Sequence, residues 1–220
     1  MPTSKPIRIA ALVSGSGTTL QNLIDRIAAR QLNAEVRLAI GSRAGLKGIE
    51  RAAAAKIMNF VVDRAEFGDC ATFSRQIFSL CDDADVDLIC LAGWRCLLDI
   101  PPKWVGRIMN IHPALLPAFG GKGMYGQRVH QAVLAHACKI SGCTVHFVDN
   151  TYDTGPIIVQ RVCAVQEDDT PESLAHRVFE EEKIAYPQAI ELFGQGRLKI
   201  EGRRVRIAAK EESLQMNDET

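Results

Sequence analysis

The stretch IRIAALVSGSGTTLQNLIDRIAAR, residues 7–30, decides the class of fold. Its first eight residues are mostly apolar and predict a buried strand over 7–14. A glycine-rich turn follows, and apolar side chains then recur at positions 20, 23, 24 and 27, which is the spacing of a helix. A strand, a tight glycine turn and a helix in this order are the start of a βαβ unit.

The alternation of strands and helices continues through the first two-thirds of the chain. Short apolar runs predict further strands at 34–42, 57–62, 86–93 and 106–112, with helical patterns between them. The run over 86–93 is almost continuously apolar, as expected for a strand inside a parallel sheet. Strands that alternate with helices predict right-handed βαβ units and therefore a parallel sheet.

The alternation of strands and helices ends in the last third of the chain. Strands over 143–149 and 156–165 are separated by a short loop, which predicts an antiparallel pair. A capping box opens a long helix over 170–196, which we expect to be kinked or interrupted near Pro187. A hairpin over 197–207 follows.

No repeat, low-complexity linker or break in composition marks a second domain. We therefore predict an α/β fold, with a doubly wound, mostly parallel sheet and an antiparallel C-terminal extension. A single catalytic domain is expected over 1–208, and a polar tail over 209–220.

Composition limits the classes of partner. The 220 residues carry 26 Lys and Arg against 26 Asp and Glu, so no overall field attracts nucleic acid or an anionic membrane. No segment approaches the ~18 apolar residues of a membrane span, and the N-terminus lacks a signal-peptide pattern. The seven cysteines form no CxxC pair, and no His and Cys residues have zinc-site spacing. We expect a cytoplasmic monomer or homodimer with reduced thiols, no metal and small-molecule partners.

The glycine turn VSGSGTTLQ, residues 13–21, predicts an anion site. It places backbone N–H groups and the positive end of a helix dipole at the residues Gly17, Thr18 and Thr19. A dinucleotide fingerprint would need a third glycine where Leu20 stands and an acidic residue after the second strand, so NAD and FAD are disfavoured. The turn suits a terminal phosphate monoester, although a plain βα turn with threonine caps explains it equally well.

Three polar side chains predict acyl chemistry at the same edge of the sheet. Asn110 and His112 end a predicted strand, and ligands of doubly wound sheets bind beyond the carboxyl ends of strands. The loop after residue 147 can bring Asp153 to that edge. The amide and a protonated imidazole could stabilise an oxyanion, and the carboxylate could raise the pKa of His112 and accept a proton.

These motifs resemble those of the formyltransferase family that uses 10-formyltetrahydrofolate. The residues concerned are NIHPALLP from 110 and HFVDNTYDTGPIIVQ from 146, together with the opening VSGSGTTLQNLID and the loop GGKGMYG. The resemblance covers roughly residues 7–200. It implies transfer of a formyl group from 10-formyltetrahydrofolate, as co-substrate, to the amine of glycinamide ribonucleotide in purine synthesis.

The resemblance also implies roles for the three polar residues. Asn110 and His112 would hold the formyl oxygen, with His112 as general acid. Asp153 would tune His112 and assist proton transfer.

Two sets of binding residues follow from the same resemblance. The substrate phosphate and ribose would be bound by Gly17, Thr18, Thr19 and Glu182. The folate would be bound by residues of the 91–98 segment and its surroundings: Leu91, Trp94, Arg95, Cys96, Leu97, Leu98, Asn110 and Val148.

Some positions depart from the family pattern. Cys70 stands where many members have an arginine that contacts the folate, and Phe179 stands where a glutamine often helps to bind the phosphate. The arginine of the folate wall comes one place early, as Arg95, and Cys96 takes its position. Lys122 is a substitute phosphate partner or a solvated loop residue.

Other reactions remain as alternatives. Water in place of the amine would make a formyltetrahydrofolate hydrolase, but those proteins have a regulatory domain before the first strand, and we expect no room for one. Transfer to methionyl-tRNA would need a further C-terminal domain and a basic face. Another amino sugar or nucleotide could be the acceptor, and a non-catalytic nucleotide-binding module would leave Asn110, His112 and Asp153 without a role.

The remaining histidines are interpreted more simply. His130 and His136 lie on a predicted helix and are expected at the surface, although His130 is close enough to the glycine loop to reach the site. His146 lies on a strand and can face the core.

Overall fold

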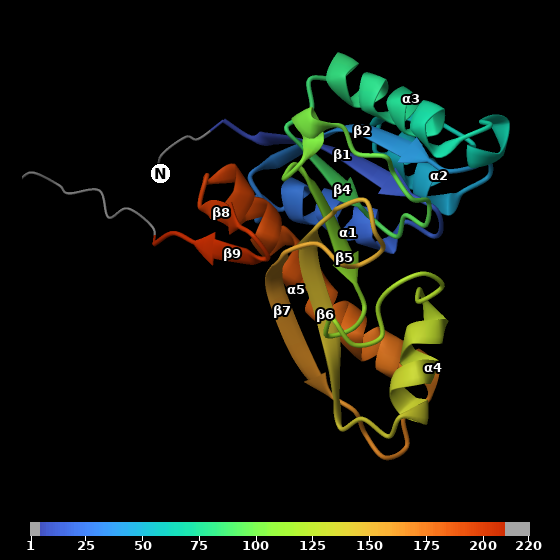
Figure 1. Cartoon of the computed structure of the whole chain (residues 1–220), viewed down its shortest axis with the longest axis vertical. Coiled ribbons are helices and arrows are strands. Elements are labelled where there is room, and N and C mark those ends of the chain that lie inside the picture. The colour runs from blue at the N-terminus through green and yellow to red at the C-terminus, as the bar shows by residue number, and fades with distance from the viewer. Residues whose placement is uncertain (1–4, 210–220) are drawn as a thin grey trace, which may run out of the picture.

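The computed structural model describes residues 5–209. Within this range, nine strands form one sheet in the order β3-β2-β1-β4-β5-β6-β7-β9-β8 (Figure 1). The strands are β1 Ile7–Val13, β2 Ala34–Gly41, β3 Met58–Val61, β4 Leu88–Leu91, β5 Ile108–His112, β6 Ile140–Phe147, β7 Ile157–Ala164, β8 Leu198–Glu201 and β9 Arg204–Ile207. The helices are α1 Thr18–Ala28, α2 Lys47–Ala54, α3 Cys70–Asp83, α4 Gln127–Ala135 and α5 Pro171–Gly194, with short 3₁₀ turns at Arg64–Glu66 and Pro102–Trp104.

The strand pairings confirm the predicted α/β class. The strands from β3 through β5 pair in parallel, whereas β6 is antiparallel to both β5 and β7. The predicted hairpin is β8–β9, and β9 joins the sheet beside β7. Figure 1 shows the parallel half with α2 and α3 in its upper part, and β6 and β7 extending below it beside α4 and α5.

The two faces of the parallel sheet carry separate cores. In β1, Ile9 packs in a cluster with side chains of α1 and α5, whereas Leu12 packs with Phe73 and Ile77 of α3. This alternation follows from the two-residue period of a strand. Apolar side chains therefore point to both faces of β1, and helices cover both faces of the sheet, as in a doubly wound fold.

The sequence of α5 accounts for where this helix begins. Thr170 and Ser173 form the predicted capping box of α5, with backbone-to-hydroxyl distances of 3.2 and 3.0 Å. The expected interruption near Pro187 is wrong, because α5 runs as one helix to Gly194 with Pro187 buried inside it, whereas a kink there stays a prediction. We attribute this continuity to packing, because the apolar residues on both sides of Pro187 are buried in the core, which offsets the lost hydrogen bond.

A second correction concerns the start of β6. This strand begins at Ile140 rather than at 143. The sequence hides its first residues, because Ile140 is an exposed apolar residue and residue 142 is a glycine. Gly142 is required there, since a Cβ would lie 2.0 Å from the carbonyl oxygen of Arg161 on β7.

Close glycine packing also shapes the turn before α1. Gly17 begins the helix with a φ of 70°, and no side chain caps the helix, so the threonine caps considered above are absent. A Cβ on Gly17 would lie 2.4 Å from the Cα of Gly48 on α2. The turn and α2 can therefore approach this closely only with glycine at both positions.

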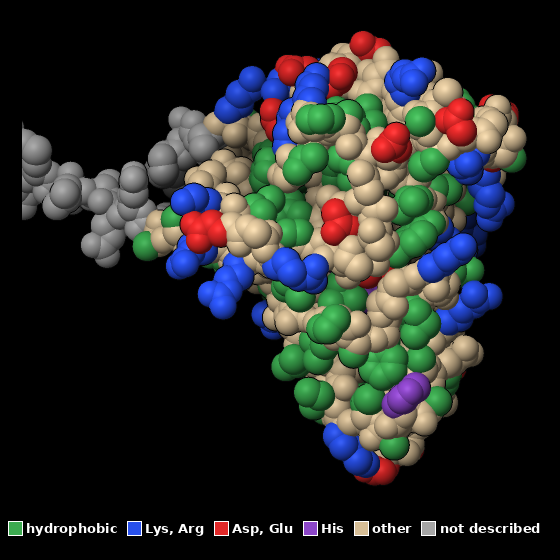
Figure 2. All heavy atoms as spheres, in the orientation of Figure 1, with side chains coloured by type: hydrophobic (Ala, Val, Ile, Leu, Met, Phe, Trp, Pro, Cys, Tyr) green, Lys and Arg blue, Asp and Glu red, His purple; other side chains and the backbone are tan. Residues whose placement is uncertain are grey.

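The surface charges, the helix lengths and the cysteines can be compared with the predictions from sequence. Charged side chains of both signs are interspersed over the face drawn in Figure 2. No helix between residues 5 and 209 is both long enough and apolar enough to cross a membrane. All seven cysteines are free. Except for Ala209, the predicted tail over 209–220 lies outside the described residues.

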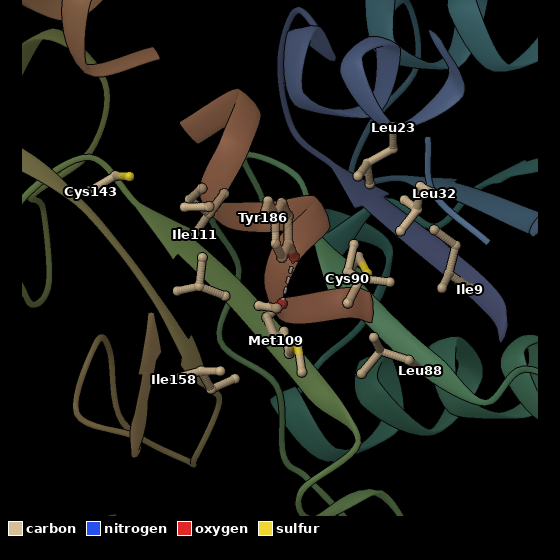
Figure 3. Close-up of a cluster of buried hydrophobic side chains, with 14 of the residues drawn as sticks. Ile9, Leu23, Leu32, Leu88, Cys90, Met109, Ile111, Cys143, Ile158 and Tyr186 are labelled. Atoms are coloured by element: carbon tan, nitrogen blue, oxygen red, sulfur yellow. Dashed lines mark hydrogen bonds between the residues drawn. The ribbon is translucent and has the colours of Figure 1, made fainter. Parts of the chain in front are cut away.

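The Tyr186 hydroxyl joins α5 to the two strands that lead into the candidate site. Its oxygen lies 3.1 Å from the carbonyl oxygen of Leu91 on β4 and 2.9 Å from that of Met109 on β5. Tyr186 is fully buried in the cluster drawn in Figure 3, which shows it beside Cys90 and Met109. Its O–H proton is therefore shared between two carbonyls at the active edge of the sheet.

We expect Tyr186→Phe to lower the free energy of unfolding by about 1–2 kcal/mol, because two buried carbonyls lose their hydroxyl partner. Chemical denaturation measures the change, with Tyr125→Phe at an exposed position as the matched control. Equal midpoints for Tyr186→Phe and the wild type would contradict this role of the hydroxyl.

Candidate active site

Two adjoining cavities open at the carboxyl ends of β1, β4 and β5. The larger is a cleft of about 720 Å³ between the glycine turn, the 121–128 segment and α5. The smaller, of about 50 Å³, lies between the 91–98 segment and the 148–153 loop. Asn110 and Asp153 line both cavities. The predicted reaction centre is therefore the wall that the two cavities share.

Asn110, His112 and Asp153 meet at this wall, as the sequence predicts. The Asn110 amide nitrogen lies 3.3 Å from Asp153 Oδ1, and His112 Nδ1 lies 3.5 Å from Asp153 Oδ2. A fourth side chain, His146, completes the cluster with Nε2 at 3.1 Å from the Asn110 amide nitrogen. Asn110 and His146 are direct neighbours across β5 and β6.

The hydrogen bonds assign the imidazole protons. His112 Nε2 lies 2.8 Å from the carbonyl oxygen of Phe119, which can only accept, so Nε2 carries a proton. His146 Nδ1 likewise donates to the carbonyl of Phe147 at 2.8 Å. In neutral His146, Nε2 is then the acceptor for the Asn110 amide. The two amide hydrogens of Asn110 thus point at His146 and Asp153.

Asp153 is held by a strained loop. Its φ of 57° lies in the left-handed region, which is uncommon for a residue other than glycine. The loop returns tightly against β6, since a Cβ on Gly155 would lie 1.7 Å from the carbonyl oxygen of Phe147. The backbone N–H of Gly121 donates to Asp153 Oδ2 at 2.9 Å. This carboxylate therefore links the loop to β5 and to the glycine-rich segment.

The carboxyl of Asp153 is ionised at neutral pH. Burial raises its pKa, but the nearby His146 and His112 and the hydrogen bond from the N–H of Gly121 outweigh burial and bring the pKa below its ordinary value. The site therefore holds a fixed negative charge beside His112.

The expected rise in the pKa of His112 is wrong. Burial lowers this pKa below its ordinary value, and the opposing charge of Asp153 does not compensate. Only 3% of His112 is exposed, so the charged imidazole loses most of its hydration. At neutral pH His112 is accordingly a neutral imidazole that donates from Nε2, and not a standing cation.

The predicted phosphate and ribose residues lie together in the larger cleft. Gly17, Thr18 and Thr19 line one side, and Glu182 of α5 lines another. Burial raises the pKa of Glu182 to about 8. Its carboxyl is therefore largely protonated at neutral pH and could donate a hydrogen bond to a sugar hydroxyl. Phe179 and Lys122 line the same cleft.

The predicted folate residues divide between the cavities. Those that line the smaller pocket are Leu91, Trp94, Cys96, Leu97, Leu98, Asn110 and Val148. Arg95 does not line that pocket: it lines the larger cleft, which Trp94 lines as well. Trp94 Nε1 is buried without a hydrogen-bond partner in the described structure, so a polar group of a ligand could pair with it.

Sequence reasoning described two further histidines of the site incompletely: it missed the contact of His146 with Asn110, and it allowed His130 to reach the site but expected it at the surface. His146 is a core-facing residue, as expected, but its contact with Asn110 depends on strand register, which the sequence does not show. The surface position expected for His130 is wrong, because only 4% of it is exposed and its pKa is lowered to about 4 by burial and by nearby His112. Its helix turns this face toward the cleft. His136 is exposed, as predicted.

No three His, Cys, Asp or Glu side chains within residues 5–209 are grouped to hold a metal ion. The absence of a metal requirement stays a prediction.

Comparisons with known proteins fit this arrangement. A family profile described as formyl transferase matches residues 7–190. The trifunctional purine biosynthetic protein adenosine-3 of Drosophila pseudoobscura pseudoobscura is 40% identical over 215 residues, which cover 96% of this chain and 15% of that protein. The chloroplastic phosphoribosylglycinamide formyltransferase of Arabidopsis thaliana is 36% identical over 195 residues, 87% of this chain and 67% of that protein.

Solved structures show the same similarity. Glycinamide ribonucleotide transformylase 1 from Symbiobacterium toebii has 41% sequence identity and a TM-score of 0.86, over 94% of this chain and 96% of that one. A formyltetrahydrofolate deformylase from Pseudomonas syringae shares the fold at 20% identity, with a TM-score of 0.80 over 93% of this chain and 66% of that one.

A mostly parallel α/β sheet with an Asn, His and Asp cluster at its carboxyl edge places the chain among α/β proteins with a polar site at the strand ends. More specifically, the chain belongs to the formyl transferase family. It spans only 14–19% of the length of the trifunctional relatives.

We expect Asp153→Asn to lower the pKa of His112 further, because it removes the negative charge that opposes the effect of burial. NMR titration of the His112 imidazole measures this shift, and Asp149→Asn in the same loop is the matched control. The wild-type pKa should itself lie below the ordinary value of about 6.5. An unchanged His112 pKa in Asp153→Asn would show that the two groups are not electrostatically coupled.

Proposed function

We propose that this chain transfers a formyl group from 10-formyltetrahydrofolate to the primary amine of N1-(5-phosphoribosyl)glycinamide, a step of purine synthesis. The observation that carries the proposal is the meeting of Asn110, His112 and Asp153 between the two cavities. The names of the relatives at 36–41% identity support this choice of donor and acceptor.

In this reaction the amine nitrogen attacks the formyl carbon, and negative charge develops on the formyl oxygen. The Asn110 amide and the Nε2–H of His112 would stabilise that oxygen. In the free chain the Asn110 amide is held by His146 and Asp153, and the His112 Nε2–H by the Phe119 carbonyl, so the formyl oxygen would displace the Phe119 carbonyl and one of the two Asn110 acceptors. The donors are thereby oriented before substrate arrives.

Proton transfer completes the exchange. The attacking nitrogen must lose a proton, and N10 of the folate must gain one as its bond to the formyl carbon breaks. Asp153 is ionised and lies next to His112, so it would accept the proton of the amine directly or through water. No covalent enzyme intermediate is needed, since the products are formylglycinamide ribonucleotide and tetrahydrofolate.

The acceptor would occupy the larger cleft. Its phosphate would bind at Gly17, Thr18 and Thr19, and its ribose near Glu182. The backbone N–H groups of this turn and the α1 dipole favour an anion at that position.

The folate would enter the smaller pocket, whose wall is largely apolar. The apolar side chains of this wall would pack against a pterin ring, and the unpartnered Trp94 Nε1 offers a hydrogen-bond donor. A volume of about 50 Å³ is too small for that ring, so the pocket must widen on binding. Trp94 and Tyr152 are the two aromatic side chains that line both cavities.

A formyltetrahydrofolate hydrolase is the alternative, in which water replaces the amine. The cleft beside the glycine turn favours a phosphorylated acceptor, which a hydrolase does not need. We also propose a cytoplasmic location, supported by seven free cysteines, and a monomeric or homodimeric state.

A coupled assay with each substrate omitted in turn tests the function. We expect tetrahydrofolate to form only when the amine acceptor is present, whereas formate release without acceptor would support the hydrolase. His112→Ala should lower kcat roughly 100-fold or more, because an oxyanion donor is lost. The exposed His136→Ala is the matched control, and near-normal turnover in folded His112→Ala would contradict the assigned role.

The phosphate assignment has its own test. Removal of the 5′-phosphate from the acceptor should reduce kcat/KM strongly, because the α1 terminus would then face no anion. Replacement of Thr18 and Thr19 by Asp should have a similar effect on the phosphorylated acceptor by charge repulsion. Unchanged kinetics in that double variant would show that the phosphate does not bind at this turn.

A further inference from the structure

Three cationic side chains face the larger cleft without an acidic partner. Arg95, Lys122 and Arg128 line it, and no carboxylate in residues 5–209 makes an ion pair with any of them. The Asp153 carboxylate in the same cleft lies next to His112 and His146 instead. The cleft therefore presents positive charge that a bound anion could neutralise.

Arg95 lies directly beside the glycine turn. Its backbone N–H donates to the hydroxyl of Ser14 at 3.1 Å, which fixes residue 95 at the end of β1. A Cβ built on Gly15 would lie 3.9 Å from a terminal nitrogen of the Arg95 guanidinium. The guanidinium thus lies close to the backbone that leads into the N-terminus of α1.

An aromatic ring holds this guanidinium from the other side. The Arg95 guanidinium carbon lies 4.6 Å from the centre of the Tyr125 ring, and that of Arg128 lies 5.1 Å from the same ring. Tyr125 belongs to a segment in which Gly121, Gly123 and Gly126 all have positive φ. The ring therefore brings two arginines together, and their mutual repulsion would fall when an anion binds between them and the turn.

We propose that Arg95 is a phosphate-binding residue for the acceptor, acting with the N-terminus of α1, and that Tyr125 positions its guanidinium. This inference rests on the proposed function and replaces the folate role expected for Arg95. A guanidinium can bind two phosphate oxygens at once, which would fix the orientation of the acceptor as well as its affinity. Glu182 in the same cleft does not oppose the anion, because its raised pKa leaves it largely uncharged at neutral pH.

Steady-state kinetics of Arg95→Met test the proposal. We expect the KM for the phosphorylated acceptor to rise roughly 10-fold or more, with kcat changed only a few-fold and with the KM for 10-formyltetrahydrofolate unchanged. The acceptor without its phosphate should show equal kcat/KM in the wild type and in Arg95→Met. Arg203→Met, an exposed arginine outside the cleft, is the matched control.

Variants of the ring separate positioning from direct binding. Tyr125→Ala should raise the KM for the acceptor less than Arg95→Met does, because the guanidinium remains but is less well held. Tyr125→Phe keeps the ring and should recover most of the affinity.

Several results would overturn the proposal. An unchanged acceptor KM in Arg95→Met would do so, as would a raised KM for the folate instead, or a loss that appears in Arg128→Met and not in Arg95→Met. If the wild type lacks formyl transfer altogether, the proposed function fails, and calorimetry with inorganic phosphate still tests the arginine. Weaker phosphate binding by Arg95→Met than by the wild type would then support the anion site, and equal binding would exclude it.

Discussion

The Asp153 carboxylate is the point at which three separate segments of the chain are joined. It accepts hydrogen bonds from the Gly121 N–H and the Asn110 amide, and it lies next to His112. One of its neighbours comes from β5 and another from the glycine-rich segment, whereas Asp153 itself comes from the loop after β6. The left-handed backbone of Asp153 is tolerated because these contacts over-determine its position. This carboxylate therefore holds both its own loop and the glycine-rich segment at the shared wall of the cavities.

Burial and the neighbouring charges shift the pKa values of Asp153 and His112 in opposite directions, and a different effect prevails at each residue. For Asp153 the hydrogen bonds and nearby imidazoles prevail over burial, so its carboxylate is charged. For His112 burial prevails over the carboxylate, so the imidazole is neutral. A neutral imidazole next to an ionised carboxylate can donate to a developing oxyanion while the carboxylate remains free to accept a proton. The two groups therefore have distinct roles although they lie 3.5 Å apart.

The fold and the meeting of Asn110, His112 and Asp153 could be predicted from sequence because their signals are local. Strand and helix periods placed Asn110 and His112 at the end of a strand, and a motif pattern placed Asp153 opposite them. Other features depend on the packed structure. The role of His146 needs the register between β5 and β6, and the low pKa of His112 needs the extent of its burial. Only the structure shows that the Arg95 side chain lines the larger cleft, because the direction of a loop side chain changes from one residue to the next.

The close approach of Gly17 to Gly48 makes the substrate turn depend on a helix that contributes no side chain to the cleft. Gly48 also donates its N–H to the carbonyl of Gly15 at 3.2 Å, and a Cβ on Gly48 would lie 3.0 Å from Val13. Any larger residue at either glycine must push α2 away from the turn. The sequence of α2 is therefore restricted at Gly48 by the packing of a turn that lines the cleft, although no residue of α2 lines that cleft.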